Sequence, residues 1–324
     1  MKDKFKQAIY NADQTECLEI GYEWYDNQIS IIPFPRTIKK VPSVLPKEIT
    51  SLKEAFNHNE NEFIDGIEYW NTSNVTDMSY IFFQASNFNQ NISMWNTSNV
   101  KKMSFMFSSA YSFNQTIGNW DTSNVTDMSG MFAWAESFNQ DISKWDVSNV
   151  ETMNSMFYGA KSFNQPIGNW NTSNITNMYS MFEYAKNFNQ PIGNWNTSNV
   201  TNMGSMFCYA ENFNQNLSNW NTSNVEDMSF MFYGVEKFNQ PLSKWETSKV
   251  KKMSYMFCWA YKFNQPIGNW NVSNVTDMNS MFYEANNFNQ DLSKWNVSNV
   301  AEYWQNIGFV NPNWKPEHQP QFKK

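Results

Sequence analysis

The sequence holds few of the residues that perform chemistry in enzymes. Its 324 residues include two histidines, three cysteines and a single arginine, Arg36. It contains no Cys/His cluster, no Gly-x-Ser-x-Gly, no glycine-rich phosphate loop and no His-Glu-x-x-His motif. We therefore predict that the protein is not an enzyme and has no catalytic, metal-binding or cofactor-binding residues.

Positive charge and long apolar runs are also scarce. The net charge is −7, whereas a surface for nucleic acid or anionic lipid needs a basic stripe. No stretch approaches the ~18 consecutive apolar residues of a membrane span. The opening residues, MKDKFKQAIYNADQTE, lack the apolar segment of a secretion signal. These features predict a soluble chain, cytoplasmic as it stands, with no nucleic-acid partner and no membrane insertion.

What the sequence does have is a 25-residue repeat. Each repeat starts at a tryptophan and follows the pattern W-N-T-S-N-V-T-D-M-S-x-M-F-x-x-A-x-x-F-N-Q-x-I-x-x. A fixed period of about 20–50 residues is typical of proteins built from stacked structural repeats. The tryptophans at position 1 are Trp70, Trp95, Trp120, Trp145, Trp170, Trp195, Trp220, Trp245, Trp270 and Trp295.

Eight positions of the repeat are apolar and nearly invariant: 1, 6, 9, 12, 13, 16, 19 and 23. Positions 9 and 12 hold seventeen of the nineteen methionines, and positions 13 and 19 are phenylalanine in all nine complete repeats. One repeat alone cannot bury enough apolar surface to offset the entropy of ordering its backbone. We therefore predict that the repeats stack and that these eight columns form a shared core.

Positions 6, 9, 12, 13 and 16 have helical spacing and fall on one face of a helical wheel. Ser and Asn at positions 4 and 5 suit a helix N-cap, and Asp at position 8 suits a first turn. A very short strand is expected near positions 21–24, limited by proline at position 22. The predicted fold class is an α/β repeat solenoid, leucine-rich-repeat-like, with one short helix and one very short parallel strand per 25-residue repeat.

Two of the cysteines share a repeat position. Cys208 and Cys258 both stand at position 14, two repeats apart, and stacked strands would place them roughly 10 Å apart. A disulfide needs Cα atoms within about 7 Å. We predict that these thiols are free.

Asparagine at position 20 and glutamine at position 21 never vary, from Asn89-Gln90 to Asn289-Gln290. They are either a polar ladder for a ligand or a column that satisfies turn backbone groups from repeat to repeat. The second interpretation is favoured, because binding surfaces usually vary between repeats whereas internal ladders do not.

The predicted organisation has four parts. Residues 1–43 form an N-terminal cap, with a short helix over 2–11 and a β-hairpin over 18–34. Residues 44–69 form a degenerate first repeat, residues 70–294 nine complete repeats, and residues 295–324 a partial repeat with a C-terminal cap and polar tail. The expected core residues of the degenerate repeat are Ile49, Leu52, Ala55, Phe56, Phe63 and Ile67, and those of the C-terminal part are Tyr303, Trp304, Ile307, Phe309, Val310 and Trp314.

Positions 11, 14 and 15 lie opposite the predicted core face, yet they are rich in aromatic residues. An extended, exposed aromatic stripe often marks an interface. Equally, the rings could stack on one another between repeats and shield the helices. The candidate partner-binding residues are Tyr80, Phe83, Phe105, Trp134, Tyr158, Tyr184, Tyr209, Phe230, Tyr233, Tyr255, Trp259 and Tyr283.

The motif W-(N/D)-T-S-N-V-T-D-M-x-x-M-F-x-x-A-x-x-F-N-Q-(P/D)-(I/L) resembles the repeat of bacterial BspA-like leucine-rich-repeat surface proteins, in particular the 25-residue type found in surface lipoproteins of wall-less bacteria. The run FPRTIKKVPSVLPKEITSLKEAF resembles the segment before the repeats in that group, so the resemblance covers about residues 31–310. It implies a leucine-rich-repeat-like fold, display at the cell surface, adhesion or host interaction, and no catalytic residues. The sequence shows no lipid-attachment cysteine, because Cys17 follows the polar run NADQTE.

These observations predict a non-catalytic repeat scaffold for protein interaction or adhesion. Its expected partner is a protein, host-derived if the resemblance holds, or a second copy of the chain. The alternative is a structural, self-assembling or particle-associated protein that packs through the aromatic stripe.

Overall fold

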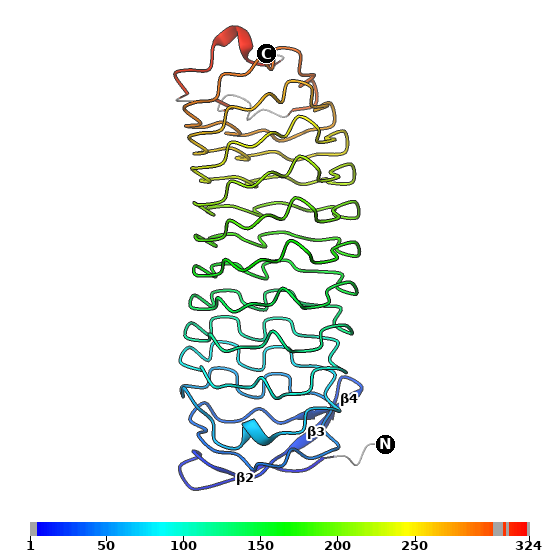
Figure 1. Ribbon diagram of the computed structural model, residues 1–324, viewed down its shortest axis with the longest axis vertical. Helices are drawn as coiled ribbons and strands as arrows, with labels where there is room; N and C mark the ends of the chain where they lie inside the picture. Colours follow the sequence, from blue (N-terminus) through cyan, green and yellow to red (C-terminus); the bar gives the residue numbers. More distant parts are fainter. Residues whose placement is uncertain (1–4, 301–306, 309–310, 323–324) are drawn as a thin grey trace. The chain divides into compact units, whose positions relative to one another are not determined.

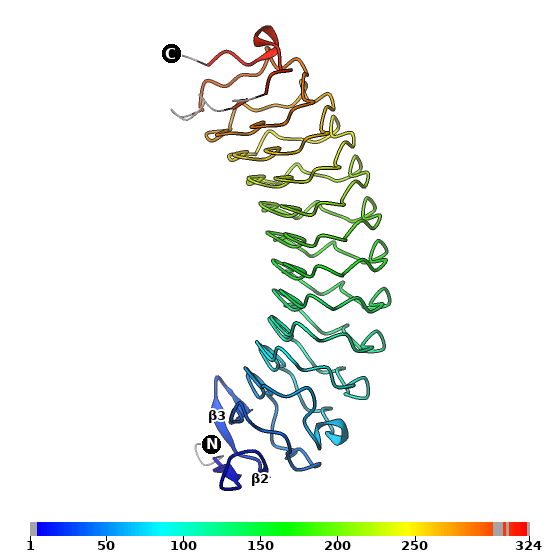
Figure 2. The ribbon, with the colours of Figure 1, turned by 90° about the vertical axis from the view of Figure 1, so that its left-hand side faces the viewer.

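The computed structural model describes residues 5–300, 307–308 and 311–322. The chain divides into two compact units. The N-terminal unit consists of Met1–Val150 with Gly159–Gln165, and the C-terminal unit consists of Glu151–Tyr158 with Pro166–Lys324. Within each unit, successive stretches of chain form coils that lie one on the next (Figures 1 and 2).

The predicted α/β, leucine-rich-repeat-like solenoid is wrong. The described residues contain no α-helix, and almost all of each repeat is turns and irregular backbone. The predicted strand near positions 21–24 is absent from the described repeats as well. Neighbouring repeats instead meet at single-residue parallel bridges at position 8, such as Asp77–Lys102 in the N-terminal unit and Asp227–Lys252 in the C-terminal unit.

The backbone conformation at positions 11 and 15 explains why no helix forms. In all nine complete repeats these two residues have φ between 52° and 67°, in the left-handed region. A right-handed helix cannot continue through such a residue. A positive φ at the third of four residues is the pattern of a type II turn. Positions 9–12 and 13–16 therefore form successive turns, which give the core positions the same spacing as a helix.

Hydrogen bonds between repeats complete this arrangement. Within each unit, alternate N–H groups, at positions 9, 11, 13 and 15, donate to carbonyls of the following repeat, while those at positions 12, 14 and 16 donate to carbonyls three residues earlier. An α-helix would direct these groups to carbonyls four residues earlier. In one repeat of the C-terminal unit the outward bonds are Met203 to Asp227 at 3.0 Å, Ser205 to Ser229 at 2.8 Å, Phe207 to Met231 at 3.0 Å and Tyr209 to Tyr233 at 2.7 Å.

The prediction of eight buried columns is confirmed. The ten repeat tryptophans are 3–5% exposed, and the other seven columns are almost completely buried throughout the described repeats. Rings stack from repeat to repeat. The ring centroids of Trp195 and Trp220 lie 6.4 Å apart, and their planes differ by 3°. In the next pair, Trp220 and Trp245, the planes differ by 4°. The indole N–H of Trp220 also donates to the carbonyl of Ile192 at 3.0 Å, so this ring joins two repeats.

The invariant Asn-Gln pair forms an internal ladder, as the favoured interpretation predicted. The side-chain oxygen of Asn189 accepts the backbone N–H of Asn214 at 2.9 Å. The side-chain amide of Gln215 donates to the same oxygen at 3.0 Å. Equivalent bonds recur in the N-terminal unit, where Asn89 accepts the N–H of Asn114 at 3.0 Å.

The N-terminal cap contains two antiparallel strand pairs. The helix predicted over residues 2–11 is wrong in its described part, since β1 (Ile9–Tyr10) pairs there with β2 (Cys17–Glu19). The predicted hairpin is confirmed by β3 (Tyr22–Tyr25) and β4 (Gln28–Ile31). Both residues between these strands have positive φ, 50° and 60°, as a type I′ hairpin turn requires.

Strand β4 covers the open side of the first coil. The N–H of Ile31 donates to the carbonyl of Ser51 at 3.0 Å, and the N–H of Thr50 donates to Ile29 at 2.9 Å. The backbone groups that a preceding repeat would satisfy are therefore paired with the hairpin.

Most of the expected core residues of the degenerate first repeat are buried: Ile49, Leu52, Ala55, Phe56 and Ile67. Phe63 is the exception. It is 51% exposed, and Ile64 is completely buried in its place. The N–H of Ile64 donates to the side chain of Gln90 at 2.9 Å, which fixes this register. A short 3-10 helix, η1 (Ile67–Tyr69), follows.

At the other end, Trp314 closes the core as predicted. It is 2% exposed, and its ring meets Phe282 edge-on at 5.2 Å and Phe288 at 5.4 Å. Ile307 is also buried. A second short 3-10 helix, η3 (Pro316–His318), lies in the tail. The remaining residues predicted for this cap, Tyr303, Trp304, Phe309 and Val310, lie outside the described residues.

Candidate interaction surface

The cysteines are poor candidates for chemistry. Cys17, Cys208 and Cys258 are free and buried. Burial raises the pKa of Cys17 to about 11 and that of Cys258 to about 12. Burial also raises the pKa of Cys208, and the adjacent Glu183 carboxylate raises it further. Because the thiolate is the reactive form, these thiols are unreactive near neutral pH.

Other ionisable groups do not gather into a recognisable centre. The described part of the chain contains no group of three or more His, Cys, Asp or Glu side chains placed to hold a metal ion. No helix there is long and apolar enough to cross a membrane.

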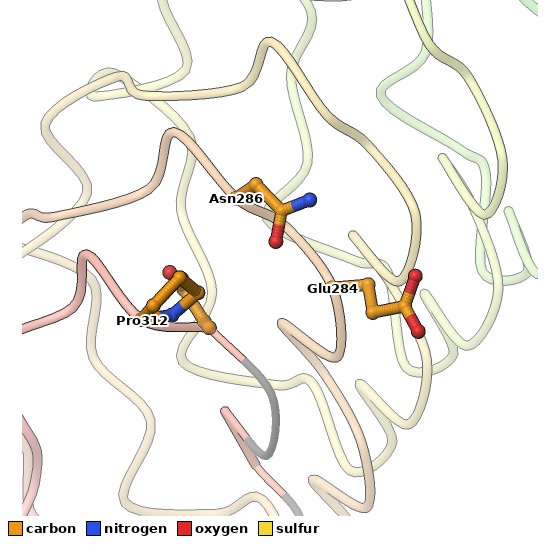
Figure 3. A pocket seen from close by; sticks show the side chains of 4 residues that line it. Glu284, Asn286 and Pro312 are labelled. Carbon is orange, nitrogen blue, oxygen red and sulfur yellow. The ribbon is translucent and has the colours of Figure 1, made fainter.

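An open hollow of about 580 Å³ in the C-terminal unit is lined by Glu284, Asn286, Asn311 and Pro312 (Figure 3).

The repeat positions that vary most carry the candidate residues. Positions 11 and 15 take the left-handed conformation at the corners of the two turns, and position 14 lies beside them. The twelve predicted aromatic residues are all half-buried, except Tyr184, which is exposed at 36%. None of them is among the buried residues that form the core.

In the N-terminal unit, the structure brings three predicted residues together. The ring of Tyr80 stacks on Phe105 in the next repeat at 5.0 Å and meets Phe83 edge-on at 5.5 Å. Trp134 belongs to the same unit and lies over Gly159, where an added Cβ would come within 2.5 Å of the indole.

In the C-terminal unit, seven predicted rings form one continuous cluster, which we call the aromatic surface. Tyr184 stacks on Tyr209 at 4.9 Å, and Phe230 stacks on Tyr255 at 4.7 Å. Tyr233 joins these two pairs, since it contacts both Tyr209 and Phe230. The aromatic surface comprises Tyr158, Tyr184, Tyr209, Phe230, Tyr233, Tyr255 and Trp259. Tyr283, also predicted, is half-buried in the following repeat, and its carbonyl accepts the N–H of Trp259 at 2.9 Å.

Several of these rings therefore stack between repeats, as the stacking interpretation expected. Around Trp259 the rings are tilted rather than parallel. The planes of Tyr233 and Trp259 differ by 44° at 5.1 Å, and those of Tyr209 and Tyr233 by 82° at 5.0 Å.

Three exposed tyrosines of the complete repeats were not predicted from the sequence. Tyr179 at position 10 is 45% exposed, and Tyr111 and Tyr261 at position 17 are 44% and 36% exposed. The helical wheel placed neither position on the outer face. Their signal in the sequence was an aromatic residue in a column that is otherwise mostly small or charged.

Carboxylates lie near several of these rings. Burial raises the pKa of Tyr158 and Tyr184, and in both cases the charge of Glu183 raises it further. Burial likewise raises the pKa of Tyr261, and the charges of Glu284 and Glu236 raise it further. Partial burial raises the pKa of the half-buried Glu183 carboxyl itself, in spite of its hydrogen bonds with Ser180 and Cys208, which lower it.

A family model described as "Mycoplasma protein of unknown function, DUF285" matches the chain three times, at residues 50–167, 135–236 and 212–311. The matches overlap and together cover most of the chain, in tandem, as expected of a repeat family. No curated protein and no solved structure matches the chain. The finer resemblance to BspA-like surface proteins stays a prediction.

Proposed function

The chain belongs to the family that this model describes, and we propose that it is a non-catalytic repeat protein that binds a protein partner through the aromatic surface. One observation carries the proposal. Eight columns are nearly invariant and buried, whereas positions 11, 14 and 15 vary between repeats and gather aromatic residues where they are partly exposed.

The chemistry of the surface favours binding. Tyrosine and tryptophan are enriched among the residues that dominate binding energy at protein interfaces. Here the rings already contact one another, as Tyr184 and Tyr209 do, so little side-chain freedom remains to be lost on association. Adhesion to a host cell is a narrower form of this proposal, supported by the resemblance of the repeat motif to surface proteins.

The proposal is tested by removing the rings without disturbing the turns. Tyr184, Tyr209 and Trp259 have positive φ, and asparagine tolerates that conformation better than most residues. The test variant therefore combines Tyr184→Asn, Tyr209→Asn and Trp259→Asn with Tyr233→Ser. The control variant combines Tyr69→Ser and Met94→Ser, which remove apolar side chains that are 70% and 84% exposed in the N-terminal unit.

Both variants and the parent chain are crosslinked to material from the native source, and the captured proteins are compared quantitatively. We expect a captured set that the parent and the control share and the test variant loses. Light scattering after size exclusion reports whether a second copy is the partner. An unchanged captured set together with an unchanged oligomeric state in the test variant would contradict the proposal.

A further inference from the structure

The part of the aromatic surface near its C-terminal end is bordered by carboxylates without cationic partners. Glu284 follows Tyr283, whose carbonyl accepts the N–H of Trp259 at 2.9 Å. The charges of Glu284 and Glu236 both act on the hydroxyl of Tyr261. Neither carboxylate forms an ion pair within the described residues, in contrast to Glu211, which pairs with Lys186 at 3.0 Å. Glu236 is exposed and Glu284 is half-buried.

The hollow adds a place for a ligand group beside one of these carboxylates. Glu284 and Asn286 line it together with Asn311 and Pro312 (Figure 3). Asn311 is buried, and its side-chain amide donates to the carbonyls of Ala285 at 2.9 Å and Phe288 at 3.1 Å. Hydrogen bonds therefore hold Asn311 in the lining that it shares with Glu284.

The rings next to these carboxylates are suited to a cation. Trp259 and Tyr233 lie 5.1 Å apart at an angle of 44°, and Tyr261 is 36% exposed in the same repeat as Trp259. The face of an indole or phenol ring attracts a lysine or arginine side chain through its quadrupole. Carboxylates beside such rings attract the same cation and repel an anion.

We propose that the region formed by Trp259, Tyr261, Glu236 and Glu284 binds a lysine or arginine side chain of the protein partner. This inference rests on the proposed function and names the chemistry of the partner segment. The cationic head lies against the ring faces and pairs with a carboxylate, and the neighbouring part of the segment occupies the hollow beside Glu284.

The probe is a fluorescein-labelled oligo-arginine peptide, with oligo-lysine and oligo-glutamate peptides of equal length for comparison. Binding to the full chain is followed by fluorescence anisotropy at low and at physiological salt. We expect the two cationic peptides to bind, the anionic peptide not to bind, and salt to weaken binding because the exposed charges are screened.

Variants then locate the binding. Glu236→Gln with Glu284→Gln should raise the dissociation constant by about fivefold or more, a loss of roughly 1 kcal/mol. The matched control, Glu151→Gln with Glu246→Gln, changes net charge equally at exposed carboxylates elsewhere and should alter it by less than about twofold. Trp259→Asn with Tyr261→Ser should weaken binding to a similar extent as the first pair. Unchanged thermal unfolding shows that each variant is folded.

Three outcomes overturn the inference: no binding of oligo-arginine, equal losses in the test and control carboxylate pairs, or no loss in either the carboxylate or the ring variant. The proposed function is judged separately by capture of native partners. If Glu236→Gln with Glu284→Gln keeps that capture while the four-residue ring variant loses it, the cation site is wrong and the proposed function stands. If the ring variant also keeps it, the proposed function itself fails.

Discussion

The side-chain oxygen of Asn189 lies 2.9 Å from the backbone nitrogen of Asn214, one repeat later, and accepts its N–H. This bond explains why position 20 is asparagine in every complete repeat. The side chain acts as part of the backbone framework, because it supplies an acceptor that the turn at the next repeat lacks.

Asn189→Ala should destabilise the protein by about 1 kcal/mol, because the N–H of Asn214 and the amide of Gln215 lose their shared acceptor. Urea unfolding followed by tryptophan fluorescence measures the change. The exposed Asn194→Ala serves as the control and should stay within about 0.5 kcal/mol of the parent. Equal effects of the two substitutions would contradict a structural role for the ladder.

Ser205→Gly distinguishes turns from a helix by the sign of its effect. Ser205 has φ of 55°, where glycine is favoured over other residues, so the substitution should stabilise the protein by about 0.5–1 kcal/mol. In a helix the same substitution would destabilise by a comparable amount. The midpoint of chemical unfolding gives the sign directly, and a lowered midpoint would argue against the left-handed turn.

Gly234→Ala should be more costly than Gly204→Ala. Gly234 has φ of 66°, and an added Cβ would lie 2.7 Å from the ring of Tyr209. We expect a loss of about 1–2 kcal/mol from the backbone conformation together with displacement of that ring. At Gly204 the nearest atoms lie 3.2 Å away and φ is not positive, so the loss should be smaller. Thermal unfolding compares the two, and a similar cost at both sites would exclude this explanation.

The stability of the protein should decrease in acid partly through Asx turns. Side-chain and backbone hydrogen bonds from Ser123 lower the pKa of Asp121, and equivalent bonds from Ser143 and Ser293 lower the pKa of Asp141 and Asp291. A carboxyl whose pKa is lower in the folded protein than in the unfolded chain stabilises the fold at pH values above the unfolded pKa, which is ~3.9 for aspartate. That contribution is lost as the pH falls through the lowered folded pKa.

Replacing these three aspartates by asparagine should therefore remove the effect while keeping the turns, since other repeats carry asparagine at the same positions. The parent should be more stable than the triple variant at pH 6, and the difference should shrink towards zero as the pH falls below about 4. Unfolding in urea across this pH range measures it. A difference that does not change with pH would contradict the assignment.

The repeat pattern predicted most of the buried core positions but little of the backbone conformation. The buried columns, the β3–β4 hairpin and the closing role of Trp314 were predicted correctly, because burial leaves a period in the sequence and tight turns have characteristic residues. Phe63 was misplaced because an inserted residue can be accommodated on either side of a core position, and only the bond from Ile64 to Gln90 decides which.

The candidate surface was predicted in part for the same reason. Aromatic residues in variable columns, such as Tyr209 and Trp259, could be found from the repeat alone. The sequence did not predict which of these rings contact one another, because that depends on which rings meet across neighbouring coils. The proximity of Glu236 and Glu284 to Tyr261 depends on how neighbouring coils lie side by side, so the sequence did not predict it.

The sequence by itself determined that the repeats share a core, since eight apolar columns at a 25-residue period cannot be buried in any one repeat. Only the tertiary structure decided between helices and turns. Both satisfy the spacing of positions 6 to 16, and the local sequence contains no donor or acceptor that separates them. The neighbouring repeat decides in favour of turns, because its carbonyls accept every second N–H group, as the carbonyl of Ser229 accepts the N–H of Ser205. These bonds stabilise the residues with left-handed conformation, which exclude a helix.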